Sequence, residues 1–180
     1  MAFWRIVGLF VAAAVVYGLV HDQITARLCL EYFTIGHPRV FASDSPTVHA
    51  LYWGVAATWW AGLAVGLLVA AASRVGRLPK LTVRQQIKPA LYLMTTMAVL
   101  AFSFGVSAYY DAKGHTGASF DQVFGGLPVP PEKQDAFMAD FAAHNASYAV
   151  GFLGGIVVAG VSIVRRARVK QPPPLPVTAG

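Results

Sequence analysis

Four long apolar runs constrain the fold of this chain more than any other feature of its sequence. They extend from about residue 6 to 20, 49 to 72, 89 to 110 and 145 to 164. A helix needs about 20 mostly apolar residues to cross the ~30 Å hydrocarbon core of a bilayer. The central part of each run contains no Asp, Glu, Lys, Arg or His. We therefore predict an all-α protein, folded as a four-helix transmembrane bundle.

The composition agrees with a lipid environment. Hydrophobic residues make up 56% of the chain and charged residues only 12%, whereas soluble domains carry roughly 25% charged residues. So few polar side chains cannot cover the surface of a globule. We predict a single transmembrane domain over residues 1–170, followed by a disordered, Pro-rich tail at 171–180 with the sequence QPPPLPVTAG.

The first apolar run has two interpretations. Arg5 precedes it, and a basic residue before a short apolar run is also typical of a secretory signal peptide. No convincing small-residue cleavage site follows the run, and the next residues, HDQITARLCLEYF, can continue as helix. We expect an uncleaved membrane helix.

The basic residues indicate the orientation of the bundle. Cytoplasmic loops of membrane proteins carry an excess of Lys and Arg. Ten of the fourteen Lys and Arg residues precede the first run, lie between the second and third, or follow the fourth. We therefore predict that both termini are cytoplasmic. The net charge of +6 then reflects these loops and not a nucleic-acid partner.

The acidic residues and the histidines gather on the opposite side. All eight Asp and Glu residues and all five His residues fall in two long connections, 21–49 and 111–144, which we predict to be extracytoplasmic. His21, His49 and His144 stand at the outer ends of three different helices. We expect these three side chains to lie at one depth.

This gathering suggests a metal centre at the extracytoplasmic face. On the fourth helix, Asp140 precedes His144 by one turn, and a carboxylate at that spacing can orient an imidazole that binds a metal. Imidazole and carboxylate ligands suit zinc, copper or non-haem iron, whereas paired histidines on two helices can hold haem. The candidate ligands are His21, His49 and His144, with Glu31, Asp22 and His37 as further ligands or proton carriers.

A structural role is the alternative for the same residues. Histidines and carboxylates are kept out of hydrocarbon, so the membrane itself partly imposes their position at one face. Interhelical hydrogen bonds and salt bridges could use all of them.

Local patterns predict helix starts and close helix contacts. Ser45-Pro46 and Pro130-Pro131 are typical of helix N-termini, because Ser is a good N-cap and Pro fits the first helical position. Gly62-x-x-x-Gly66 and Gly151-x-x-x-Gly155 let helices approach closely. That approach occurs either within one bundle or between two copies in a homo-oligomer.

Trp59 and Trp60 lie in the middle of the second run, away from the interfaces where Trp usually concentrates. Together with Tyr148 they could shape a pocket for a lipid, a quinone or haem. Ordinary packing against lipid and neighbouring helices is the alternative.

One part of the chain resembles a known family. The residues that carry the resemblance are HDQITARLCLEYFTIGHP, followed by SPT and GVAATWWAGL. They look like those of a bacterial family of small four-helix integral membrane proteins of uncharacterised activity. The resemblance covers about the first third of the chain. It implies a location in the bacterial cytoplasmic membrane, and it implies no activity or cofactor.

Three functions fit these features. The first is a metal- or haem-binding redox protein, and the second is a non-enzymatic accessory or assembly subunit of a membrane complex. The third is a transporter of a neutral or lipid-like solute, since the spans lack the charged residues that often mark ion pathways. The chain contains no hydrolase elbow, phosphate loop or dinucleotide fingerprint. The sequence leaves open whether the protein is an enzyme.

Overall fold

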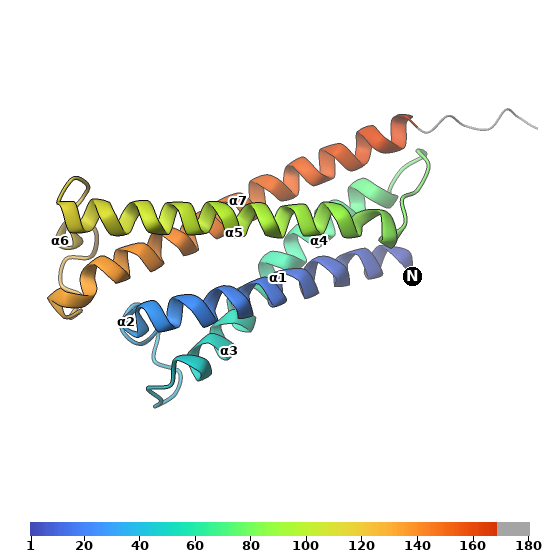
Figure 1. The fold of residues 1–180 in the computed structure, drawn as a ribbon. Helices are drawn as coiled ribbons and strands as arrows, with labels where there is room; N and C mark the ends of the chain where they lie inside the picture. The colour runs from blue at the N-terminus through green and yellow to red at the C-terminus, as the bar shows by residue number, and fades with distance from the viewer. Residues whose placement is uncertain (169–180) are drawn as a thin grey trace, which may run out of the picture.

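The structure, a computed structural model, describes residues 1–168, which form helices and no strand (Figure 1). The predicted tail at 171–180 lies outside the described residues. In chain order the helices are α1 (Ala2–Leu28), α2 (Leu30–Thr34), α3 (Pro46–Ala56), α4 (Trp59–Arg74), α5 (Val83–Gly114), α6 (Phe120–Phe124) and α7 (Pro131–Arg168).

Four helical stretches are long and apolar enough to cross a membrane, which confirms the predicted all-α architecture. They are α1, the stretch Pro46–Arg74 that comprises α3 and α4, α5 and α7. The helices extend beyond the apolar runs at both ends. α7 has 38 residues, so at ~1.5 Å per residue it is about 57 Å long, roughly twice the hydrocarbon thickness. The surplus carries polar side chains past the apolar part of the bundle.

The helices associate in two layers. α5 packs along α7, and α1 packs along α3 and α4. The first half of α1 also meets the first half of α5 in an apolar core that includes Ile6, Phe10 and Leu93. Farther along the chain, α1 and α5 diverge toward the end that bears α2 and α6 (Figure 1). We call this end, which holds His21, His37 and His144, the histidine end.

Glycines allow the helices to approach within the bundle, as the sequence patterns predicted. A Cβ atom on Gly62 would lie 2.7 Å from the Ala14 Cβ, and one on Gly155 would lie 2.9 Å from the Val65 Cγ1. Near the histidine end, a Cβ atom on Gly18 would lie 2.5 Å from the Gly54 carbonyl oxygen. α1 and α3 therefore touch backbone to backbone one turn before His21.

The second membrane-crossing stretch is interrupted, which the sequence did not predict. α3 begins at Pro46 with Ser45 as its N-cap, as expected, and it ends at Ala56. α4 begins at Trp59 after a turn at Ala57 and Thr58. This turn frees the Ala57 carbonyl, which accepts a hydrogen bond from the Tyr148 hydroxyl at 2.8 Å. A side chain from α7 thus satisfies a backbone group that the broken helix leaves open.

The end of the bundle opposite the histidine end is closed by structural polar contacts. The buried Arg166 guanidinium donates to carbonyl oxygens of residues 72, 75, 78 and 79, in and after α4. Beside it, the Gln86 amide donates to the Ser73 and Ser162 hydroxyls at 2.9 and 3.0 Å. These bonds fix the connection between α4 and α5 to the end of α7.

Candidate metal centre

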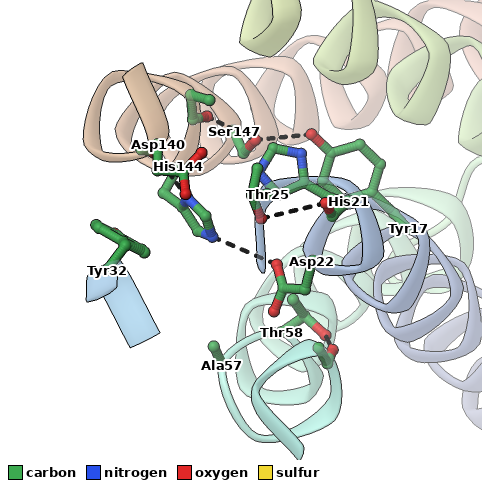
Figure 2. Close-up of polar contacts among 12 residues, drawn as sticks. Tyr17, His21, Asp22, Thr25, Tyr32, Ala57, Thr58, Asp140, His144 and Ser147 are labelled. Carbon is green, nitrogen blue, oxygen red and sulfur yellow. Dashed lines mark hydrogen bonds and ion pairs between the residues drawn. The ribbon is translucent and has the colours of Figure 1, made fainter. Parts of the chain in front are cut away.

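Three side chains with metal-binding atoms converge inside the histidine end. They are His21 and Asp22 from α1 and His144 from α7 (Figure 2). One ligand atom from each residue lies within 4.8 Å of those of the other two. The His144 Nε2 and the Asp22 Oδ1 are 3.3 Å apart. The Asp22 side chain is 5% exposed and that of His144 is 13% exposed, so both are largely shielded from water.

The two helices hold these residues in register through a contact one turn deeper. The Tyr17 hydroxyl on α1 and the Ser147 hydroxyl on α7 share a hydrogen bond of 2.7 Å (Figure 2). α1 and α7 run in opposite directions, so the residue one turn after Tyr17 meets the residue one turn before Ser147. Those residues are His21 and His144, whose ring centroids are 4.7 Å apart in an edge-to-face arrangement.

The backbone of α7 fixes the tautomer of His144. Its Nδ1 donates to the Asp140 carbonyl oxygen at 2.7 Å, so a neutral ring carries its lone pair on Nε2. That lone pair faces an Asp22 carboxylate oxygen, which is also an acceptor. Two acceptors at this distance need a proton or a cation between them. The arrangement fits either an imidazolium–carboxylate ion pair or a bound metal ion.

The 3.3 Å separation is compatible with both solutions, since it lies within the ~4 Å limit of an ion pair. Ion pairs that share a proton between N and O are usually about 2.7–2.9 Å long. Two ligands of a tetrahedral ion with bonds of ~2.0 Å lie about 3.3 Å apart. The His144 contact with a backbone carbonyl is also the arrangement that usually orients a metal-binding histidine. The geometry thus has the spacing and the histidine orientation that a metal site needs.

His21 completes the set with an unused nitrogen. Its Nε2 is buried and has no hydrogen-bond partner among residues 1–168. The ring stacks on that of Tyr17, with centroids 5.5 Å apart. Such a buried acceptor or donor is costly unless something binds it.

A cavity of about 90 Å³ adjoins the three side chains. Its polar wall also includes Tyr32, Thr58 and Tyr148, and its deeper wall is apolar. At ~30 Å³ per molecule this space holds about three waters, and it is smaller than the roughly 150 Å³ cavity that accepts benzene. The space is sized for an ion and a few waters. A metal ion at the centre would have a coordination position open to a water or a small substrate.

His49, His37 and Glu31, the other proposed ligands, lie outside this three-residue group. The His49 Nε2 donates to the Ser43 carbonyl oxygen at 2.8 Å, and its ring contacts that of Phe41. Glu31 accepts a weak hydrogen bond from the Cys29 thiol. His49 and Glu31 stay outside the group for local reasons. The loop before α3 folds back onto His49, and α2, which carries Glu31, turns away from α1 at Cys29.

His37 lines the cavity without joining the group. Its Nδ1 donates to the Tyr32 carbonyl oxygen at 2.8 Å, and its ring packs on Trp53. Burial lowers the pKa of His37 below its usual value. Burial, reinforced by the Asp140 carboxylate, raises the pKa of the Tyr32 hydroxyl. Both side chains are thus uncharged walls of the cavity near neutral pH.

The three proposed pocket aromatics have separate positions. Tyr148 lines the cavity. Trp60 stacks on the far side of Tyr148, with ring centroids 5.8 Å apart, and is half exposed. Trp59 lies outside the cavity lining and is also half exposed. These three residues therefore do not enclose one pocket.

Some site residues gave little or no signal in the sequence. From the sequence, Asp22 was only a secondary candidate ligand, although it adjoins His21. Thr58 lines the cavity because α3 ends early, and its hydroxyl donates to the Gly54 carbonyl at 2.5 Å. Tyr32 lies on α2, beyond the break at Cys29, and its ring packs on His144 with centroids 4.6 Å apart.

Comparisons of this chain with protein-family models, curated proteins and solved structures found no match. The geometry of the site is thus the basis for inferring function.

Proposed function

We propose that the protein is a multi-pass membrane metalloprotein that binds one divalent transition-metal ion through His21, Asp22 and His144. The observation that carries this proposal is the contact between the His144 Nε2 and the Asp22 Oδ1. These two acceptors lie 3.3 Å apart while the other ring nitrogen of His144 is occupied by a backbone carbonyl. A metal ion satisfies both acceptors and the unused nitrogen of His21.

The ligand set favours a catalytic ion over a purely structural one. Structural zinc sites are closed by four protein ligands, whereas catalytic sites keep a position for water or substrate. Two histidines and one carboxylate with open positions are typical of non-haem iron(II) oxygenases, and the same ligand types occur in zinc hydrolases. The adjacent cavity supplies the open position. We favour a redox centre built on iron or copper, with zinc as the non-redox alternative.

The membrane context follows from the charge distribution. The ends of α1 and α7 that carry Ala2 and Arg168 lie at the same end of the bundle (Figure 1). The excess of Lys and Arg near this end supports a cytoplasmic location for it. The metal centre would then face the extracytoplasmic side of a bacterial cytoplasmic membrane, in keeping with the family resemblance.

Metal analysis of the purified, membrane-reconstituted chain tests the proposal. After loading with Fe(II), Cu(II) or Zn(II) and removal of excess ion, we expect one ion per chain. His144→Ala, His21→Ala and Asp22→Asn should each lose the ion, while His49→Ala, whose ring lies outside the group, should retain it. A folded wild-type protein that binds none of these ions would overturn the proposal and leave the ion pair as the role of His144 and Asp22.

A further inference from the structure

A second and larger hollow opens on the side of the bundle between α1, α5 and α7. Its volume is about 670 Å³, within the range of pockets that bind drug-sized ligands. It lies where α1 and α5 diverge toward the histidine end (Figure 1). Exposed apolar side chains such as Val20, Ile24 and Phe102 form its walls. At this position in the bundle, the hollow is a groove that faces lipid.

Two side chains with buried polar atoms line the groove, and one of them has no partner within residues 1–168 or in the proposed metal centre. Asp140 is fully buried, lines the groove, and has neither carboxyl oxygen hydrogen-bonded among the described residues. His21 lines the groove as well as the small cavity, but its Nε2, unpaired within residues 1–168, is the atom that the proposed metal ion would take up. Buried polar groups without partners are rare in folded proteins and call for a ligand or water.

Charge limits what can bind there. The groove lining contains no Lys or Arg, so an anionic phosphate head group would meet a carboxyl group and no cation. A hydroxyl group suits the site better, because it can hydrogen-bond to the carboxyl group without carrying a charge.

Aromatic residues surround the level of these two polar groups. Gly105 on α5 lies against the Ala139 and Ala143 positions of α7, with 3.3 Å between a Cβ atom on the glycine and either neighbour. It is therefore level with Asp140. Phe102 and Tyr109, each about one turn from Gly105, line the groove together with Tyr17. Such rings favour edge-to-face or offset contact with another aromatic ring.

We propose that the groove binds an uncharged amphiphile with a hydroxylated aromatic head group, its hydroxyl hydrogen-bonded to Asp140 and its apolar tail in the bilayer. Because His21 also belongs to the metal centre, the head group lies beside that centre. The inference rests on the proposed function in one respect, namely that the metal centre would use this amphiphile as its class of substrate. Binding in the groove does not itself require the metal.

Equilibrium binding of a decyl-substituted hydroquinone to the chain in lipid nanodiscs tests the inference. We expect saturable binding to the wild type, weakened at least about tenfold in Val106→Trp, which places an indole in the groove. Phe104→Trp is the matched control, since residue 104 is exposed on the same helix outside the groove lining, and its affinity should be unchanged. Asp140→Ala should weaken binding to a similar degree.

Unsaturable binding to the wild type, or equal affinity of Val106→Trp and the wild type, would overturn the inference. If decanol binds saturably and equally tightly, the groove does not select an aromatic head group, and that part of the inference would be wrong. Metal content, measured on the same samples, separates the two proposals. Hydroquinone binding by a wild type that takes up no ion would overturn the metal centre alone. A wild type that takes up one ion but shows no saturable hydroquinone binding would overturn the groove alone.

Discussion

The His144 Nε2 lies 3.3 Å from the Asp22 Oδ1, while the His144 Nδ1 donates to the Asp140 carbonyl oxygen at 2.7 Å. One ring nitrogen is thus committed to the backbone and the other faces a carboxylate on a different helix. This pair joins α7 to α1 inside a region that water hardly reaches. An ion pair and a pair of metal ligands lead to different expectations for the response of the protein to a bound ion.

Metal removal should destabilise the wild-type protein. A ligand that binds only the folded state at 100 times its Kd stabilises that state by about 2.7 kcal/mol. Chelation should therefore lower the midpoint of thermal unfolding, and restoring the ion should raise it again. His144→Ala should show no response to chelator or ion. An equal response of the variant would place the bound metal elsewhere.

Gly18→Ala should separate α1 from α3 and disturb the metal centre. The added Cβ would lie 2.5 Å from the Gly54 carbonyl oxygen and would collide with the Thr58 side chain. Overpacking of this kind costs about 1–3 kcal/mol, and we expect weaker metal binding because Asp22 follows one turn later on α1. Gly8→Ala is the control, because a Cβ atom there meets nothing within 4 Å. Unfolding and metal titrations that fail to distinguish the two variants would contradict the close α1–α3 contact.

Tyr17→Phe should lower the free energy of unfolding only slightly, and it should weaken the contact that aligns α1 with α7. The substitution removes the 2.7 Å hydrogen bond to Ser147, which is worth about 0.5–1.5 kcal/mol. The Ser147 hydroxyl keeps its own bond to the Ala143 carbonyl oxygen, so no buried donor is left without a partner. Ser147→Ala removes both bonds and should be the more destabilising change. Chemical unfolding of the two variants in parallel gives the comparison, and the reverse order would be inconsistent with this geometry.

Cys29 should resist alkylation in the folded protein. Its side chain is completely buried, and burial raises the pKa of the thiol from 9.0 to about 12. At pH 8 only about one thiol in ten thousand is then ionised, and the thiolate is the reactive form. Iodoacetamide labelling followed by mass spectrometry should show slow modification of the native chain and rapid modification of the unfolded chain. Rapid labelling of the native chain would mean that the α1–α2 junction opens readily.

The same thiol should make stability fall at high pH. The pKa of the thiol is higher in the folded state than in the unfolded state. The contribution of Cys29 to the free energy of unfolding is therefore fully present below pH 9.0 and is lost as the pH rises toward about 12. Over this range only the unfolded state releases the proton. Cys29→Ala should show a smaller decline over this range. Unfolding midpoints of both chains at several alkaline pH values measure the difference.

Much of the fold follows from one-dimensional features of the sequence. The apolar runs predicted four membrane-crossing stretches, because a helix in lipid must satisfy its backbone hydrogen bonds internally and needs a minimum length. Ser45-Pro46 predicted the start of α3, and Pro130-Pro131 predicted the long α7. The break at Ala57 and Thr58 had no such signal. The carbonyl that it frees is bound by the Tyr148 hydroxyl, from a residue 91 positions away.

The sequence by itself determined the helices, their approximate lengths and the end of the bundle at which polar chemistry gathers, because hydrocarbon tolerates few other arrangements of such a chain. Only the tertiary structure decided that His21 and His144 meet Asp22 and not His49. Hydropathy fixes how deep a residue lies, but it says nothing about the rotation of one helix against another. That rotation is set by contacts such as Gly18 against Gly54 and Tyr17 with Ser147, which join residues far apart in the chain.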